Sequence, residues 1–242
     1  VIYTSSTGAV GKRDDGLPAD ESVKLNLLDQ RSFYELSKAE AEEAALSYHK
    51  KGLNIVSLNP SFLFGVRDSR PTPTGEMIVK FLNRVYPCYF DARLCVSDID
   101  STVDAHVKAM TVGESGQRYI LAHERHYTLS EMFRMLSEIS GIASPGLKLP
   151  AKLVRASSIV NEAVLGLLGL AGRVSPIIES EIVRYFMLDA QYDSRLARKV
   201  FGFQERDFRE VLKDEVAWYV KNGYVKRSSK IIFYRKIGKL KR

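Results

Sequence analysis

Two kinds of segment alternate along the first half of the chain. Short runs typical of buried strands, such as Val1–Thr4, Asn54–Leu58 and Arg118–Leu121, are separated by longer segments with helical apolar spacing. After Leu121 only helical patterns follow. Strands that alternate with helices form a parallel sheet covered by helices. The sequence therefore predicts an α/β fold in which a parallel sheet is accompanied by a smaller, mostly helical domain.

The composition limits what such a chain can do. Its 242 residues are enough for one or two domains with a core. No apolar run reaches the length of a membrane span. The two cysteines, Cys88 and Cys95, and the four scattered histidines show neither disulfide nor metal-ligand spacing. We therefore expect a cytoplasmic protein without a structural metal.

The net charge of +7 is concentrated at the C-terminal end. Eight basic residues and no acidic residue lie between Lys226 and Arg242, which leaves 28 basic against 29 acidic residues in the remainder. This remainder has no basic excess for a nucleic-acid groove, so we expect no nucleic-acid partner. Residues 226–242 have two interpretations. Gly238 and a short apolar run favour a solvated, disordered tail, whereas the mixture of basic and bulky apolar residues favours peripheral contact with an anionic membrane.

A tyrosine and a lysine four residues apart distinguish one helix. The segment from Gln30 to Lys51 is predicted to be helical and to end at Gly52. On this helix Tyr34 and Lys38 share a face. An ammonium group beside a phenol favours the phenolate form, and such a phenol can exchange a proton with an alcohol or a ketone. The same spacing also fits a surface tyrosine and lysine, so the interpretation depends on other segments.

Two other segments supply that support. Ser5-Ser6-Thr7-Gly8 follows the first strand, and Asn59-Pro60 follows the strand Asn54–Leu58. With Tyr34 and Lys38, these pieces resemble the extended short-chain dehydrogenase/reductases, also called the NAD-dependent epimerase/dehydratase superfamily. The resemblance covers the chain to about Tyr224. It implies a Rossmann sheet, and it implies that the N-terminal half of that sheet, with its glycine-rich turn, is missing from this sequence.

Further segments point to one branch of this superfamily. Asn59 to Gly65 resembles the family's Asn-Pro-x-x-x-x-Gly turn, which packs its backbone against nicotinamide. The proline- and threonine-rich segment Arg70–Gly75 resembles the dihydroflavonol-reductase-like branch, which includes hopanoid-associated sugar epimerases. A rigid loop before a helix N-terminus also explains that segment.

The resemblance implies roles for individual residues. Ser6 would hold the substrate oxygen, with Ser5 and Thr7 as alternatives one residue away. Tyr34 would be the general acid/base, and Lys38 would bind the ribose hydroxyls of NAD or NADP. The implied coenzyme-binding residues are Thr4, Ser5, Tyr34, Lys38, Pro60, Ser61, Phe62 and Leu63. The implied substrate-binding residues are Ser6, Thr7, Asn59, Thr74 and Arg118, although Asn59 is equally interpretable as a structural hydrogen-bonding residue.

Three functions are compatible with these residues. The first is a reductase or dehydrogenase that transfers a hydride at a secondary alcohol or ketone. The second is a nucleotide-sugar epimerase or dehydratase, in which the hydride returns to the same substrate. The third, from another class, is a non-catalytic fragment or scaffold, because a chain without the glycine-rich half would bind a dinucleotide poorly. The substrate would be a sugar nucleotide or a flavonoid-like or lipid-like alcohol or ketone, and a homodimer is left open.

The element pattern predicts a division of the chain. Residues 1–66 and 94–122 form the partial Rossmann domain, 67–93 and 123–225 the substrate-binding domain, and 226–242 the basic tail. Asp98 or Asp100 is expected to cap a helix that ends near Val112. Other predicted helices cover residues 76–84, 129–140 (with a Thr128 and Glu131 capping box), 151–171, 179–188, 194–200 and 208–222.

Overall fold

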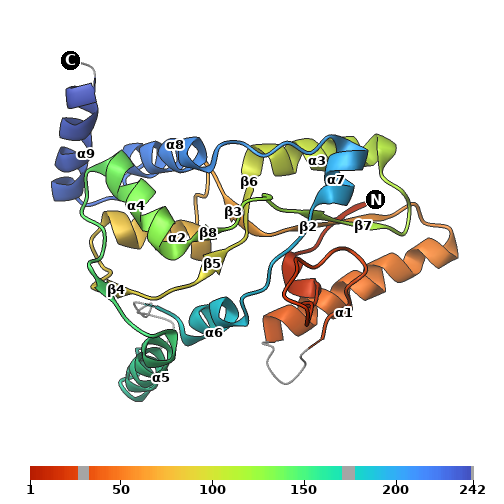
Figure 1. The fold of residues 1–242 in the computed structure, drawn as a ribbon, viewed down its shortest axis with the longest axis horizontal. Coiled ribbons are helices and arrows are strands. Elements are labelled where there is room, and N and C mark those ends of the chain that lie inside the picture. The colour runs from red at the N-terminus through yellow and green to blue at the C-terminus, as the bar shows by residue number, and fades with distance from the viewer. Residues whose placement is uncertain (27–32, 171–177, 241–242) are drawn as a thin grey trace. The chain divides into compact units, whose positions relative to one another are not determined.

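A computed structural model describes residues 1–26, 33–170 and 178–240 of the chain (Figure 1). These residues form two compact units. Unit 1 comprises residues 1–65, 95–126 and 190–211, and unit 2 comprises residues 66–94, 127–189 and 212–242. Each unit is therefore assembled from three separate stretches of the chain.

Unit 1 is built around a three-stranded parallel sheet in the order β1-β2-β7. The sheet confirms the predicted parallel α/β arrangement, because Ile2 pairs with Val56 and Leu58 pairs with Tyr119. A second parallel pair joins β3 to β6. The elements of this unit are β1 (Ile2–Thr4), η1 (Thr7–Ala9), α1 (Phe33–Ser47), η3 (Tyr48–Lys51), β2 (Val56–Pro60), β3 (Phe62–Phe64), β6 (Val96–Asp98), α3 (Ile99–Val112), β7 (Arg118–Leu121) and α7 (Arg195–Phe201).

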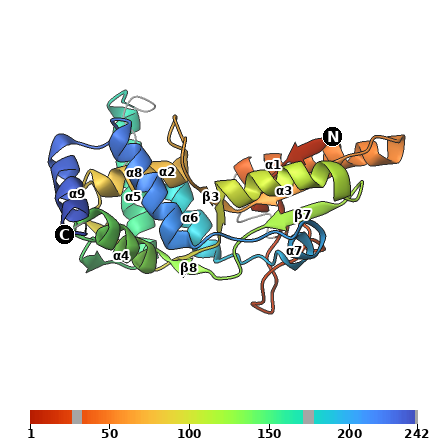
Figure 2. The ribbon, with the colours of Figure 1, turned by 90° about the horizontal axis from the view of Figure 1, so that it is seen from above.

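The two faces of this sheet differ in chemistry. Alternate residues of a strand point to opposite faces. Val56 and Leu58 pack with Ala105 of α3 and Phe201 of α7 in an apolar cluster. Ser57 and Asn59, which alternate with them, are fully buried and bond to the α1 side chain Glu42. Figures 1 and 2 show α3 and α1 on opposite sides of the sheet. The α1 face is therefore a buried polar face.

Residues 190–211 belong to unit 1, which corrects their assignment to the substrate-binding domain. Ala19 forms a parallel β-bridge with Tyr192. The ring of Phe201 lies 4.5 Å from that of Tyr119 on β7. These contacts join residues far apart in sequence, so local patterns could not reveal them. Residues 123–126 also lie in unit 1, although the sequence division placed them in the substrate-binding domain.

Unit 2 is mostly helical, with two short strand pairs, β4-β9 and β5-β8. Its core includes the stacked rings of Phe81 on α2 and Phe133 on α4, with centroids 5.6 Å apart. Thr128 and Glu131 form the predicted capping box of α4. The elements are α2 (Pro73–Leu82), β4 (Cys88–Tyr89), β5 (Arg93–Leu94), β8 (Tyr127–Thr128), α4 (Leu129–Ser140), β9 (Leu147–Lys148), α5 (Ala151–Leu167), α6 (Ser180–Leu188), α8 (Phe208–Lys221, of which 212–221 lie in this unit) and α9 (Arg227–Leu240).

The basic C-terminal segment is a helix, which corrects the expectation of a disordered tail. Helix α9 packs against α4 and buries Ser229 and Phe233. The two helices pack closely where α4 ends, because a Cβ added at Gly141 would lie 3.2 Å from Ile232 Cγ2 of α9. Burial of the Phe233 ring supplies the stabilisation that the sequence of the helix lacks by itself. Lys241 and Arg242 lie outside the described residues, as do parts of two predicted elements, residues 30–32 and 171.

Two surveys of the described residues bear on the expected function classes. None of their helices is both long and apolar enough to cross a membrane. The same residues contain no group of three or more His, Cys, Asp or Glu side chains placed to hold a metal ion.

Candidate active site

The first strand ends in a tight hydroxyl-rich turn. Ser5 is buried, and its Oγ has no hydrogen-bond partner among the described residues. Ser6 caps the short helix η1, and its Oγ accepts a hydrogen bond from the Gly8 N–H at 3.1 Å. This turn follows the carboxyl end of a parallel strand, the edge at which ligands bind in open α/β sheets.

Helix α1 brings Tyr34 and Lys38 to this turn. A Cβ added at Gly8 would lie 3.4 Å from Ser6 Oγ and 3.3 Å from Tyr34 Cε1. The Ser6 hydroxyl and the Tyr34 ring therefore both lie close to Gly8, where a larger residue would crowd them. The Tyr34 side chain is 54% exposed, so its ring is accessible to solvent. Lys38 Nζ lies 5.8 Å from the centroid of that ring.

A buried polar network lies beneath this turn. The Glu42 carboxylate accepts hydrogen bonds from Ser57 Oγ at 3.0 Å and from Asn59 Nδ2. It also forms an ion pair with Arg118, with Nη1 and Oε1 2.9 Å apart. The same Asn59 amide donates to the carbonyl oxygen of Ser6 at 3.0 Å. The network therefore links α1, β2 and β7 to the turn that carries Ser6.

These contacts bear on two residues that were predicted to bind the substrate. The Asn59 side chain is fully buried and engaged with Glu42, Ser57 and Ser6, which favours its structural interpretation. Arg118 donates to Glu42 and to the carbonyl oxygens of Glu21 and Val23. Its guanidinium thus fixes the loop after residue 12 to the sheet. Both side chains thus have structural partners within unit 1.

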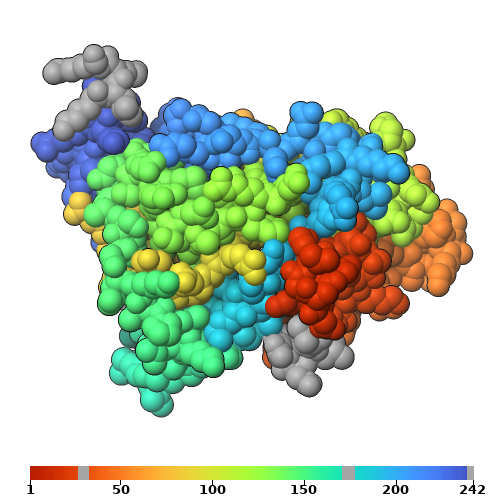
Figure 3. Space-filling view, viewed as in Figure 1, coloured from red at the N-terminus to blue at the C-terminus, as the bar shows by residue number. Residues whose placement is uncertain are grey.

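The loop held by Arg118 covers part of unit 1. Glu21 Oε1 accepts the Ile120 N–H at 2.9 Å, and burial raises the pKa of the Glu21 carboxyl. Asn26 binds both the N–H and the carbonyl of Lys12. In Figure 3, residues 1–26 (red) form one patch on the visible face of unit 1.

Other predicted coenzyme residues are placed differently from the expected turn. The segment after Asn59 is extended: Phe62–Phe64 forms β3 and pairs with β6, and Ser61 Oγ donates to the Cys95 carbonyl. Residues 59–65 are therefore largely extended where the resemblance implied a turn: Pro60 is the last residue of β2, and Leu63 lies in β3. Thr4 Oγ1 lies 2.9 Å from His106 Nε2 of α3, on the face opposite α1. Thr7 is buried within η1.

Thr74 belongs to unit 2, where the proline- and threonine-rich segment is tightly held. Its hydroxyl lies 3.0 Å from that of Thr72, the N-cap of α2. The Asp68 carboxylate accepts bonds from the Thr72 N–H and from Tyr219 Oη. Burial, with Glu215 and Asp68 nearby, raises the pKa of Tyr219. A Cβ at Gly75 would lie only 2.0 Å from Tyr219 Oη, so this position requires glycine.

Three residues at the site were not singled out by the sequence. Gly8 permits the close approach of Ser6 and Tyr34, and Glu42 and Ser57 form the buried network. A signal for Glu42 was present, because it follows Tyr34 by eight residues and Lys38 by four, on one side of the helix. The alternation of Ser57 and Asn59 with apolar residues was a second signal.

A parallel sheet with a serine turn at its carboxyl edge and a Tyr-x-x-x-Lys helix beside it is the arrangement typical of the short-chain dehydrogenase kind of Rossmann fold. The chain belongs to the NAD dependent epimerase/dehydratase family, whose model matches residues 1–122. It is 35% identical over 93% of its length to a Synechocystis protein named "Putative dihydroflavonol 4-reductase". It is 25% identical over 93% of its length to sterol demethylase protein B of Methylococcus capsulatus, 67% of which is covered.

A solved structure supports the same fold. The nucleoside-diphosphate-sugar epimerase PA4631 from Pseudomonas aeruginosa matches with a TM-score of 0.76 and 25% identity, covering 93% of this chain and 68% of the other. The chain spans 65% of the length of the Synechocystis relative. The family is thus established for this chain, and the family is NAD-dependent.

Proposed function

We propose that the protein transfers a hydride between NAD(P) and a secondary alcohol or ketone, as a reductase of the dihydroflavonol-reductase-like kind. The observation that carries this proposal is that Ser6 Oγ and the Tyr34 ring both lie close to the Cβ position of Gly8, with the Lys38 ammonium 5.8 Å from the tyrosine ring. A hydroxyl from the turn after β1 and a phenol and an ammonium from α1 lie near one another there. Family membership supports the same chemistry.

Each group has a distinct role in this proposal. Ser6 Oγ accepts a hydrogen bond from the Gly8 N–H, and its own hydroxyl donates a hydrogen bond to the substrate oxygen, which fixes that oxygen near Tyr34. Tyr34 Oη gives a proton to the oxygen during reduction and takes it back during oxidation. Lys38 would bind the ribose hydroxyls of the coenzyme. When bound, the coenzyme supplies the hydride.

The residues present fit the nicotinamide end of such a coenzyme. The buried, unpartnered Ser5 hydroxyl and the space beside Gly8 lie at the carboxyl edge of the sheet. Lys38 on α1 and the segment from Pro60 to Leu63 at the end of β2 would hold the nicotinamide end of the coenzyme. The first strand is not followed by a Gly-x-x-Gly-x-x-Gly turn, the usual pyrophosphate site. The choice between NAD and NADP therefore falls to residues outside this turn.

The test is the substitution Tyr34→Phe in the full-length protein. Loss of the proton donor is expected to lower kcat by at least about a hundredfold. Turnover is measured by NAD(P)H absorbance with three probes: a dihydroflavonol, a sterol and a UDP-sugar. Tyr48→Phe is the matched control, because Tyr48 is also exposed and also has a lysine, Lys51, over its ring. Near-normal turnover of Tyr34→Phe would show that the Tyr-Lys spacing is accidental.

The same experiment distinguishes the competing functions. An epimerase would convert the UDP-sugar without net release of reduced coenzyme. The likeness to a nucleoside-diphosphate-sugar epimerase supports this alternative function. A non-catalytic scaffold would bind neither NADH nor NADPH in a fluorescence titration. Lys38→Ala is expected to weaken coenzyme binding in both enzyme cases.

We also propose that helix α9 makes peripheral contact with an anionic membrane surface. With the helix docked on α4, Arg227, Ile231, Tyr234 and Arg235 remain exposed. Arginines beside an aromatic ring and an aliphatic side chain suit the headgroup region of an anionic bilayer. Such contact would suit a lipid-like substrate, and the name of the sterol demethylase relative supports that substrate class.

A further inference from the structure

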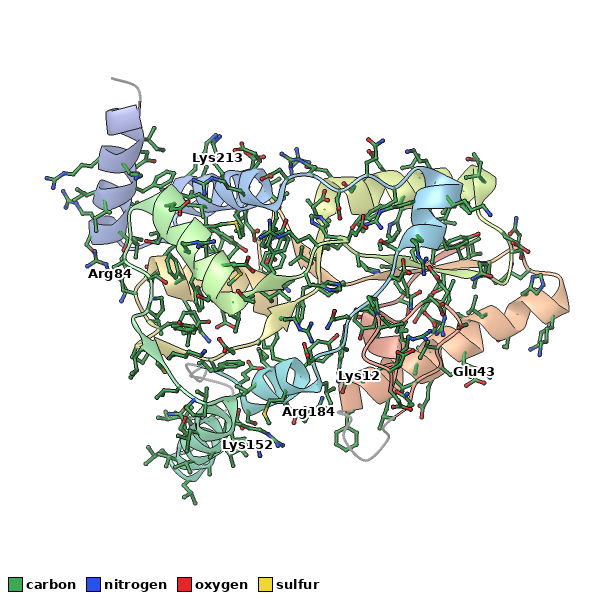
Figure 4. The ribbon with its side chains drawn as sticks, viewed as in Figure 1. Lys12, Glu43, Arg84, Lys152, Arg184 and Lys213 are labelled. Atoms are coloured by element: carbon green, nitrogen blue, oxygen red, sulfur yellow. The ribbon has the colours of Figure 1, made fainter. Side chains whose placement is uncertain are left out.

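One carboxylate beneath the proposed site is buried without an evident catalytic use. Glu42 lies in the middle of α1, and its side chain is only 4% exposed. Its neighbour on the helix, Glu43, is exposed and projects from α1 away from the sheet (Figure 4). A buried carboxylate destabilises the fold unless charged or polar partners satisfy it. The partners of Glu42 therefore indicate what its burial achieves.

Those partners connect two parts of the proposed site. Glu42 follows Lys38 by four residues and Tyr34 by eight on the same helix. Through its carboxylate it holds the Asn59 amide, and that amide also donates to the Ser6 carbonyl at 3.0 Å. One side chain, Asn59, thus links Glu42 on the helix of Tyr34 to the backbone of Ser6. The Arg118 guanidinium fixes the other oxygen of Glu42.

We infer that Glu42 is a positioning residue that, through Asn59, fixes the Ser6 turn relative to the helix carrying Tyr34 and Lys38. This inference rests on the proposed function for its catalytic meaning. Ser6 and Tyr34 lie 28 residues apart in the chain, so their spacing depends on the contacts that α1 makes with η1 and with β2. Misplacement of a reacting group by about 1 Å lowers a rate by about a hundredfold. Glu42 sets this spacing without touching the substrate.

The substitution Glu42→Gln tests the link with little change in volume. A glutamine amide nitrogen replaces one carboxylate oxygen and faces a donor, either Asn59 Nδ2 or Arg118 Nη1. In either orientation the charge-assisted bond from Asn59 Nδ2 to Glu42 is lost, so the Asn59 amide holds the Ser6 carbonyl less firmly. Hydrogen exchange of the peptide covering residues 5–11 is expected to accelerate, because the Ala9 N–H bonds to that carbonyl at 3.0 Å. Glu43→Gln is the matched control and is expected to leave this exchange unchanged.

A kinetic cycle separates positioning from a general structural role. In the full-length protein Glu42→Gln is expected to lower kcat about tenfold or more, with little change in KM. In a Ser6→Ala background the same substitution is expected to have a smaller effect, because no serine hydroxyl remains to be positioned. A merely structural role would lower kcat by the same factor in both backgrounds.

The outcomes are distinguishable. Unchanged exchange at residues 5–11, or equal factors in both backgrounds, would overturn the inference. If Ser6→Ala and Tyr34→Phe both retain normal turnover, the proposed function fails, and the exchange measurement still decides whether Glu42 fixes the turn. If Glu42→Gln does not fold, Asn59→Ala replaces it, because it removes the link to Ser6 and leaves the ion pair of Glu42 with Arg118.

Discussion

At the scale of single residues, burial makes chemically similar groups behave differently. Cys95 is 3% exposed and packs with Val10, Ile120 and Tyr192, whereas Cys88 is partly exposed. Burial raises the pKa of the Cys95 thiol to about 11, although a hydrogen bond with Ser61 opposes the rise. Because the thiolate is the reactive form, Cys95 should be inert.

We expect only Cys88 to react with a thiol reagent at pH 8 in the folded protein. At that pH about one Cys95 thiol in a thousand is ionised, and burial blocks access to it. Peptide mass spectrometry after labelling measures both positions, and labelling in denaturant supplies the positive control. Comparable native labelling of Cys95 in a Cys88→Ser variant would contradict the described burial.

At the scale of elements, local signals explain which predictions succeeded. Helix α4 begins and ends at the predicted residues because Thr128, Glu131 and Gly141 provide its caps. Strand β7 also matches its predicted bounds. Asp98 and Asp100 were the two candidates for the N-cap of α3, and the structure shows that it is Asp98. The segment of helix α9 was expected to be a disordered tail, because the helix is stabilised by packing on α4 and not by its own sequence.

The structure changes how the membrane proposal for α9 is tested. Deletion of residues 226–242 would remove the buried Phe233 and disturb unit 2, so charge reversal is preferable. Arg227→Glu with Arg235→Glu is expected to lower sedimentation with phosphatidylserine vesicles at low salt by at least about tenfold, since each basic residue contributes about 1 kcal/mol. High salt should release the wild type.

The control for this test is a double variant with the same change in net charge at positions outside α9. Lys152→Glu with Lys213→Glu reverses two charges on α5 and α8, and both lysines are exposed in Figure 4. Equal sedimentation of the two double variants would eliminate α9 as a membrane contact.

At the scale of the whole molecule, contacts between distant residues hold each unit together. Asp98 Oδ2 accepts bonds from His123 Nε2 at 3.1 Å and from the Arg206 N–H at 3.3 Å. Burial would raise the pKa of Asp98, but bonds from His123, Ser101 and Arg206 outweigh it and lower the pKa to about 2. A carboxyl whose pKa falls on folding stabilises the fold above its unfolded pKa and loses this effect as pH decreases.

We therefore expect unit 1 to lose stability between pH 4 and pH 2, with Asp98 contributing on the order of 2 kcal/mol. Asp98→Asn keeps the helix cap but should be less stable at pH 7 and change less on acidification. Urea unfolding at several pH values, followed by circular dichroism, measures this. Asp100→Asn is the control, because its pair with Arg206 is exposed. Equal acid sensitivity of wild type and Asp98→Asn would argue against this role.

The sequence predicted the sheet and the pair Tyr34 and Lys38, because strand patterns and helix spacing are local. It did not predict the buried network, because a glutamate such as Glu42 in a polar helix is usually exposed. Nor did it predict the bridge between Ala19 and Tyr192, or the two-residue strands of unit 2, which pair segments far apart in the chain. Such pairings are tertiary properties, and propensity does not encode them.

Each unit is formed by three separate stretches of the chain, and this constrains how the protein can fold during its synthesis. The chain passes from one unit to the other five times, and the last stretch of unit 1 ends only at residue 211. Asp68 can accept its hydrogen bond from Tyr219 only after residue 219 has been synthesised, and Asp98 can accept its bond from Arg206 only after residue 206 has been synthesised. Neither unit can be completed while the ribosome still holds the C-terminal third, so the nascent chain carries exposed apolar strands for most of its synthesis. Such a chain depends on protection during translation more than a chain whose domains emerge one after the other.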